Sequence, residues 1–115
     1  AAGTGGTAAG IINGHNSTTV EVFPVLKGGW MQSAIQAALS VEQSTWRVID
    51  GYHFGGYAKR PAALLDFCAT FSSTFNIPLE PIYTAKLFYG VLDQIRQGVY
   101  PPGSRLVTYH SGGIY

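Results

Sequence analysis

The sequence predicts an α/β fold of three layers, in which an open, mostly parallel sheet carries helices on both faces. Two observations predict it. Short apolar segments rich in β-branched residues alternate with amphipathic segments of helical period, and glycine-rich turns follow several predicted strands. Strands joined by helices pair in parallel, and such a sheet binds its ligand at the carboxyl ends of its strands. The turns at that edge are therefore the candidate site.

The first element is a glycine- and threonine-rich loop over residues 3–10 (GTGGTAAG), which runs into a helix predicted over residues 7–13. Glycines let the backbone approach an anion closely, and a helix start adds unpaired N–H groups with a favourable dipole. The loop therefore predicts an anion cradle, most often for phosphate. Only Ala1 and Ala2 precede it, so we expect a strand upstream and a larger parent protein.

Other uses of this loop differ in the partners they need. A P-loop is excluded, because no Gly-Lys-Ser/Thr follows at the required spacing. A dinucleotide-binding loop is an alternative: Gly3, Gly5 and Ala8 fit the G-x-G-x-x-G/A pattern, and Glu21 lies at about the distance of a ribose-binding carboxylate. Glu21 falls inside a predicted strand, however, rather than at its end. A glycine-rich turn without a ligand is the third possibility.

The remaining elements follow from apolar periodicity and from turn residues. Strands are predicted over residues 18–26, 45–50 and 105–110, and helices over residues 30–39, 60–75 and 83–97. The helix residues expected to be buried are Met31, Ile35, Ala38, Leu39, Leu64, Phe67, Cys68, Phe71, Phe75, Leu87, Phe88, Val91, Leu92 and Ile95. Residues 51–57 (GYHFGGY) are too irregular for an ordinary turn and are predicted to be a site loop.

Composition limits the class of protein. The chain of 115 residues is 46% hydrophobic and only 11% charged, whereas a soluble domain usually carries roughly 25% charged residues. We therefore expect apolar surface that a further part of a larger protein covers. A net charge of +1 without a basic run argues against nucleic acid or an anionic membrane as partner. The single cysteine, Cys68, is expected to be buried and is compatible with a reducing, cytoplasmic compartment.

Four loops in order, at residues 3–7, 55–57, 81–86 and 110–113, together resemble one family. The phrase EPIYTAK at residues 80–86, followed by PGSRL and HSGG, is similar to a D/E-P-V-Y-x-G-K…P-x-G-S…H-x-G-G pattern. That pattern is typical of pyridoxal-phosphate enzymes of the tryptophan synthase β-subunit fold, in the branch of 1-aminocyclopropane-1-carboxylate (ACC) deaminase and D-cysteine desulfhydrase. The resemblance covers residues 1–115, as the C-terminal part of the large, cofactor-binding domain.

The resemblance implies pyridoxal 5'-phosphate as cofactor. Residues that match its phosphate loop are Thr4, Gly5, Gly6 and Thr7. Backbone N–H groups and hydroxyls would hold the phosphate, in agreement with the anion cradle predicted from the residues alone.

Tyr83 and Tyr57 match the two tyrosines over the active site of the deaminases. A phenol there can hydrogen-bond the substrate or move a proton, while packing with a satisfied hydroxyl is the structural alternative. Thr84 occupies the position where the deaminases carry a glutamate that pairs with the pyridine nitrogen. A hydroxyl leaves the ring a weaker electron sink, which favours a desulfhydrase-like or other amino-acid lyase that releases ammonia and a keto acid.

In this family, the Schiff-base lysine lies far N-terminal to the phosphate loop. Lys27, Lys59 and Lys86 do not match it and are interpreted as solvated or helix-start charges. We therefore expect the chain alone to be inactive. Its expected partners are the N-terminal part of the same enzyme, a small amino-acid substrate and further copies in a homo-oligomer. A non-catalytic fragment that self-associates through its apolar surface is an alternative.

The histidines show no metal-ligand spacing. No cysteine pair accompanies His15, His53 or His110, and no carboxylate follows any of them by three or four residues, so no metal site is expected. His53 and His110 lie beside predicted site loops, where packing or a loop hydrogen bond is the expected role.

Overall fold

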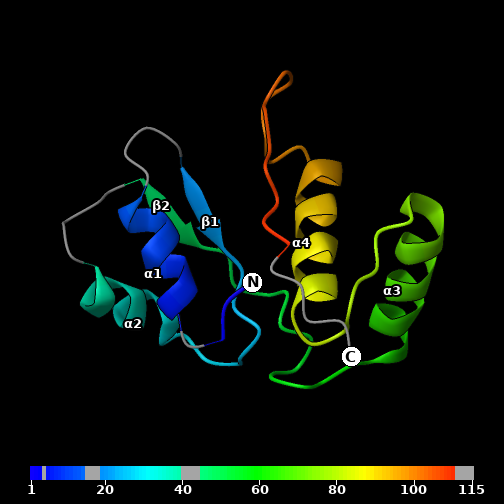
Figure 1. The fold of residues 1–115 in the computed structure, drawn as a ribbon, viewed down its shortest axis with the longest axis horizontal. Coiled ribbons are helices and arrows are strands. Elements are labelled where there is room, and N and C mark those ends of the chain that lie inside the picture. Colours follow the sequence, from blue (N-terminus) through cyan, green and yellow to red (C-terminus); the bar gives the residue numbers. More distant parts are fainter. Residues whose placement is uncertain (4, 15–18, 40–44, 111–115) are drawn as a thin grey trace.

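The computed structural model describes residues 1–3, 5–14, 19–39 and 45–110. Its elements follow one another as α1 (Gly6–Asn13), β1 (Val20–Val22), α2 (Met31–Ala38), β2 (Trp46–Val48), α3 (Ala62–Phe75) and α4 (Thr84–Arg96) (Figure 1). Within the described ranges, no helix is both long and apolar enough to cross a membrane.

The sheet is parallel. β1 and β2 pair in parallel, with Val20 opposite Trp46 and Val22 opposite Val48. On the other side of the β1 segment, Ala2 forms a single parallel bridge to Pro24. The predicted α/β fold with a parallel sheet is therefore confirmed, and the glycine loop directly follows Ala2 at the carboxyl end of this bridge.

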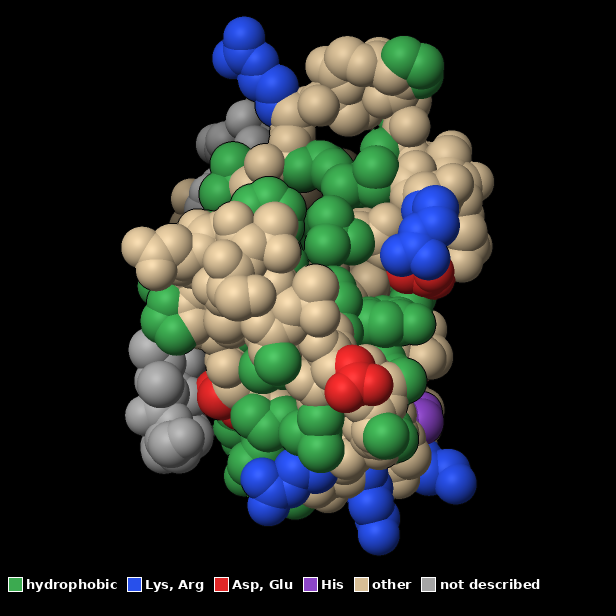
Figure 2. All heavy atoms as spheres, turned by 90° about the vertical axis from the view of Figure 1, so that its right-hand side faces the viewer, with side chains coloured by type: hydrophobic (Ala, Val, Ile, Leu, Met, Phe, Trp, Pro, Cys, Tyr) green, Lys and Arg blue, Asp and Glu red, His purple; other side chains and the backbone are tan. Residues whose placement is uncertain are grey.

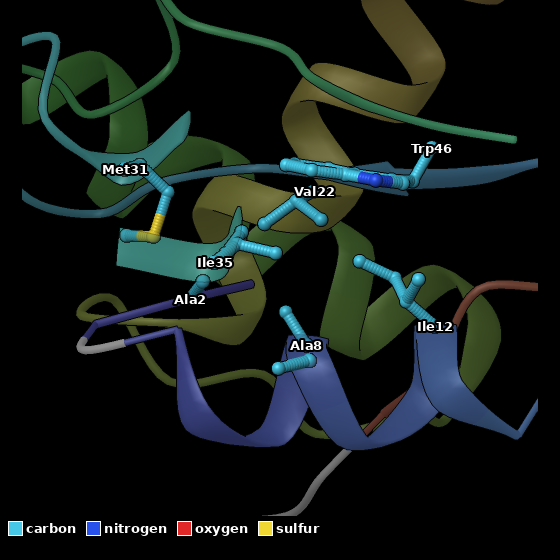
Figure 3. Packing of buried hydrophobic residues seen from close by; sticks show 8 residues of the cluster. Ala2, Ala8, Ile12, Val22, Met31, Ile35 and Trp46 are labelled. Carbon is cyan, nitrogen blue, oxygen red and sulfur yellow. The ribbon is translucent and has the colours of Figure 1, made fainter. Parts of the chain in front are cut away.

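Helices cover both faces of the sheet. Val22 and Trp46 face Ala8 and Ile12 of α1, with α2 beside them (Figure 3). The strand alternates its side chains, so Glu21 points to the opposite face, where α4 lies. The helix α3 packs against α4 through a second apolar cluster. This cluster comprises Leu64, Phe71, Leu79 and Ala85. The three-layer prediction therefore holds.

The predicted strand over residues 105–110 is wrong. These residues form no strand, and the side chain of Val107 is 95% exposed. A strand needs a neighbour for its backbone hydrogen bonds, and no strand of the described part of the chain pairs with this segment. The first predicted strand is also shorter than expected, since only residues 20–22 form β1 and Pro24, without an N–H, contributes one bridge.

Some apolar residues expected in the core lie at the surface. Ala38 is exposed, Phe75 is 58% exposed and Ile95 is 48% exposed. On the α3 side of the molecule, hydrophobic side chains lie at the surface among polar ones (Figure 2). Leu65 and Ile77 belong to this set, at 44% and 41% exposure. The predicted helical period was right, but the outermost positions of each apolar stripe stay largely open to solvent, even where one side packs, as the Phe75 ring does on Phe71 with centroids 4.7 Å apart.

Candidate functional site

The glycine loop places an open helix start at the edge of the sheet. Gly5 is the N-cap of α1 and has φ of 91°, a left-handed conformation that side chains rarely adopt. A Cβ on Gly5 would lie 3.1 Å from Ile35 and 3.2 Å from the Met31 sulfur, so the turn also lacks room for one. The N-cap residue is a glycine and so offers no side-chain cap to α1, and the first turn of the helix holds no acidic residue. The predicted anion cradle therefore has the backbone form that it requires.

Four residues were predicted from the sequence to form this cradle. Gly5, Gly6 and Thr7 lie at the N-cap and first turn of α1, whereas Thr4 lies outside the described residues.

Tyr83 lies against the glycine loop. Its hydroxyl and a ring carbon lie 3.5 Å from the position that a Cβ on Gly3 would take. The Tyr83 hydroxyl donates to the Tyr57 hydroxyl at 3.3 Å, and the two rings meet edge to face with centroids 5.8 Å apart. The structure thus brings together the glycine loop, Tyr57 and Tyr83. Tyr57 is 49% exposed, so its ring is open to a ligand or to a covering segment.

The buried carboxylate of Glu80 organises the start of α4. Its oxygens accept the backbone N–H groups of Ile82, Tyr83 and Thr84 at 2.7, 2.8 and 2.7 Å. The side chain of Glu80 is only 2% exposed. It therefore caps the helix and fixes the backbone that carries Tyr83. In the sequence, an acidic residue four positions before Thr84 was the available signal for this cap.

The hydroxyl of Thr84 is engaged inside the protein. It accepts the backbone N–H of Glu80 at 2.9 Å and lies 3.3 Å from both the carbonyl and a carboxylate oxygen of Glu80. Thr84 is 1% exposed. Its hydroxyl thus closes the turn at the start of α4, whatever further partner it has.

Lys86 was interpreted from the sequence as a solvated or helix-start charge, and its exposure contradicts the solvated half of that interpretation. The side chain is 1% exposed, and its Nζ donates to the carbonyl of Gly56 at 2.9 Å. Burial lowers the pKa of Lys86, and the nearby charge of Glu80 opposes that change. Sequence reasoning missed this contact. The available signal was a cation in the first turn of a helix, where the macrodipole disfavours it.

The histidines and Cys68 take local roles. The backbone N–H of Gly55 donates to His53 Nδ1 at 3.1 Å, and His110 Nε2 lies 2.9 Å from the carbonyl oxygen of Pro78. His15 lies outside the described residues, among which no cluster of metal-binding side chains occurs. Cys68 is half-buried rather than buried, and its Sγ donates to the carbonyl of Leu79 at 3.0 Å. Burial raises the pKa of the Cys68 thiol.

Glu21 does not serve the glycine loop. It lies in the middle of β1, where it accepts the Tyr100 hydroxyl at 2.6 Å and the Arg47 Nε at 2.6 Å. A ribose-binding carboxylate has to stand at a strand end beside the loop. The dinucleotide alternative therefore loses the residue on which it depended.

The fold defines an α/β protein, and a glycine turn that opens a helix at the carboxyl edge of its parallel sheet, faced by two phenols, is its candidate small-molecule anion site. Comparisons with known proteins narrow this class. The chain is 29% identical, over 99% of its length, to a Pyrococcus horikoshii protein named "Putative 1-aminocyclopropane-1-carboxylate deaminase". It is 28% identical, over its whole length, to a Thermotoga maritima protein of the same name.

A solved ACC deaminase homologue has the same fold. Its crystal structure superposes on 84% of this chain with a TM-score of 0.71 and 29% sequence identity. No family model matches the chain. The chain spans 38% and 40% of the lengths of the two curated relatives and 34% of that crystal chain. The resemblance predicted from the loops is thus confirmed: the chain is similar to proteins named ACC deaminase in sequence, and to a solved ACC deaminase homologue in fold.

Proposed function

We propose that this chain forms the phosphate-binding side of the active site in a pyridoxal-phosphate-dependent amino-acid deaminase or lyase. One observation carries the proposal: Tyr83 lies over the glycine loop with its hydroxyl 3.3 Å from that of Tyr57. The names of the relatives support the deaminase class.

The described residues fit the cofactor's phosphate. The left-handed turn at Gly5 and a helix start whose N-cap has no side chain would leave backbone N–H groups for an anion, without an acidic side chain in the first turn. Gly5, Gly6 and Thr7 would hold the phosphate, with Thr4 as the fourth residue of the loop. When bound, the cofactor supplies an electron sink for charge that develops at the α-carbon of an amino acid.

The two tyrosines supply the groups that face the substrate. Their hydroxyls would bind its carboxylate or amine, and a proton can pass between them along their 3.3 Å hydrogen bond. Each ring restricts the other because they pack edge to face. A ligand on the glycine loop would thus meet Tyr83 first and Tyr57 beyond it.

Thr84 favours elimination over opening of a cyclopropane ring. A hydroxyl at this position does not hold a proton on the ring nitrogen as a carboxylate does, so the ring withdraws electrons less strongly. The hydroxyl is also held in place by Glu80. We infer a desulfhydrase-like activity, in which D-cysteine and one water molecule yield pyruvate, ammonia and hydrogen sulfide, in preference to the ACC deaminase activity of the relatives' name. Sulfide release from D-cysteine, set against 2-oxobutyrate release from ACC by the same preparation, distinguishes the two.

The cofactor proposal is tested on the complete protein as its gene encodes it. We expect a yellow protein, and borohydride reduction should label a lysine other than Lys27, Lys59 and Lys86. Gly5→Ala should weaken binding of pyridoxal phosphate by roughly fivefold to 150-fold, because the binding conformation of the turn would carry backbone strain of ~1–3 kcal/mol. Gly10→Ala is the matched control, since Gly10 lies inside α1 with no described atom within 4 Å of its Cβ position. A colourless protein that binds NAD would overturn the proposal.

A further inference from the structure

One face of α4 holds the loop of residues 51–57. Near the middle of the helix, the Tyr89 ring meets Phe54 edge to face, with centroids 4.9 Å apart. One turn further, Asp93 accepts the Tyr52 hydroxyl at 2.6 Å. Between them, a Cβ on Gly90 would lie 3.0 Å from the Tyr52 ring, so helix and loop are in close contact. These positions share a face because residues three and four apart on a helix are neighbours.

Lys86 continues the same face toward the start of α4. Its ammonium donates to the carbonyl oxygen of Gly56, which also accepts the backbone N–H of Lys59 at 3.1 Å. The contact is costly. A buried ammonium loses its hydration and here stands in the first turn of a helix, at the positive end of the macrodipole. The buried carboxylate of Glu80 offsets part of that cost. An apolar side chain of similar volume would fill the same space without this desolvation cost.

We propose that Lys86 is a positioning residue that fixes the Tyr57 hydroxyl against Tyr83. Gly56, the residue that Lys86 binds, directly precedes Tyr57 and has φ of 122°, a conformation that glycine readily adopts and other residues do not. The backbone of Tyr83 is held in turn by Glu80, whose carboxylate accepts the backbone N–H of Tyr83. The two buried charges thus fix the backbone beside each phenol, Glu80 at Tyr83 and Lys86 at the residue before Tyr57. The functional part of this inference rests on the proposed function, whereas the structural part does not.

Amide hydrogen exchange on the complete protein without substrate tests the structural part. Lys86→Met keeps the length of the side chain and removes its donor. We expect roughly tenfold faster exchange at the Gly56 and Lys59 amides, because a hydrogen bond to a charged group is lost. The amide of Ile49, which donates to Val22 in the sheet, should exchange as before. Lys27→Met is the matched control, because it removes an exposed charge beside the same loop.

Unchanged exchange at Gly56 and Lys59, or an equal increase at Ile49, would overturn the inference. Lys86→Gln, which keeps a shorter neutral donor, is a second variant for the case that Lys86→Met does not fold. Its effect should have the same pattern, and a uniform loss of protection would count against a local role.

A double-mutant cycle tests the functional part. Lys86→Met should lower kcat roughly tenfold in the parent protein and less than about twofold when added to Tyr57→Phe, since it acts through that hydroxyl. Equal factors in both backgrounds would contradict this role. A complete protein with no activity toward amino acids would refute the proposed function, while the exchange experiment would still decide whether Lys86 holds the loop.

Discussion

Replacing Gly90 by alanine is expected to destabilise the fold, although alanine is the better helix former. In an open helix position, the change would stabilise by ~1 kcal/mol. At Gly90, however, the new methyl group would lie 2.7 and 2.8 Å from two carbons of the Phe23 ring and 3.0 Å from Tyr52. Overpacking of this kind costs ~1–3 kcal/mol. With ring atoms on two sides, we expect the upper part of that range and a net loss of ~1–2 kcal/mol.

The assay compares Gly90→Ala with Gly10→Ala by urea unfolding of the complete protein. Gly10 also lies inside a helix, but it is exposed and has no described atom within 4 Å of its Cβ position. Its replacement should therefore raise the free energy of unfolding by up to ~1 kcal/mol. The same chemical change is thus expected to lower the free energy of unfolding at Gly90 and to raise it at Gly10. If both stabilise the protein, α4 does not approach the sheet as closely as described, and the reasoning about its loop-holding face fails as well.

Two further predictions concern single hydroxyls. Burial and the hydrogen bond to Glu21 raise the pKa of Tyr100 from 10.0 to about 12, so between these values the native state binds more protons than the unfolded state. Stability from this phenol is complete below pH 10 and is lost as the pH rises toward 12; Tyr100→Phe should make that loss shallower in urea midpoints measured against pH. Thr84→Val should cost ~1–3 kcal/mol, because it leaves the buried N–H of Glu80 unpaired, whereas Thr84→Ser keeps the bond. Equal thermal stability of these two Thr84 variants would contradict the hydrogen bond.

The helices could be predicted from the sequence because their signals are local. Asn76 ends α3 in a left-handed conformation, and Gly98 follows α4 with φ of 74°, as their residue types indicate. The parallel sheet could also be predicted, from the alternation of strand-like and helix-like segments. The prediction of a strand over residues 105–110 was wrong for a physical reason. An apolar, β-branched run becomes a strand only if another strand pairs with it, and the pattern within one segment does not reveal that partner.

The site was predictable in part. The glycine loop, Tyr57 and Tyr83 stand out in the sequence, and the fold brings these residues together. The contact between Lys86 and Gly56 does not stand out, because it joins residues 30 positions apart through a backbone carbonyl. A carbonyl is present in every residue, so only the path of the loop decides which one the lysine meets.

The segment EPIYTAK at residues 80–86 carries two buried charges that each fix the backbone near one of the tyrosines. Glu80 holds the backbone of Tyr83, and Lys86 holds the carbonyl that precedes Tyr57. Both charges are buried, and each has a hydrogen-bond partner within the protein. Burying these charges costs desolvation free energy, and the result is a fixed geometry in which the hydroxyls of two phenols 26 positions apart lie 3.3 Å from each other. It follows that Lys86→Met should impair the alignment of the tyrosines more than it impairs the stability of the sheet, since the sheet rests on apolar contacts that this lysine does not touch.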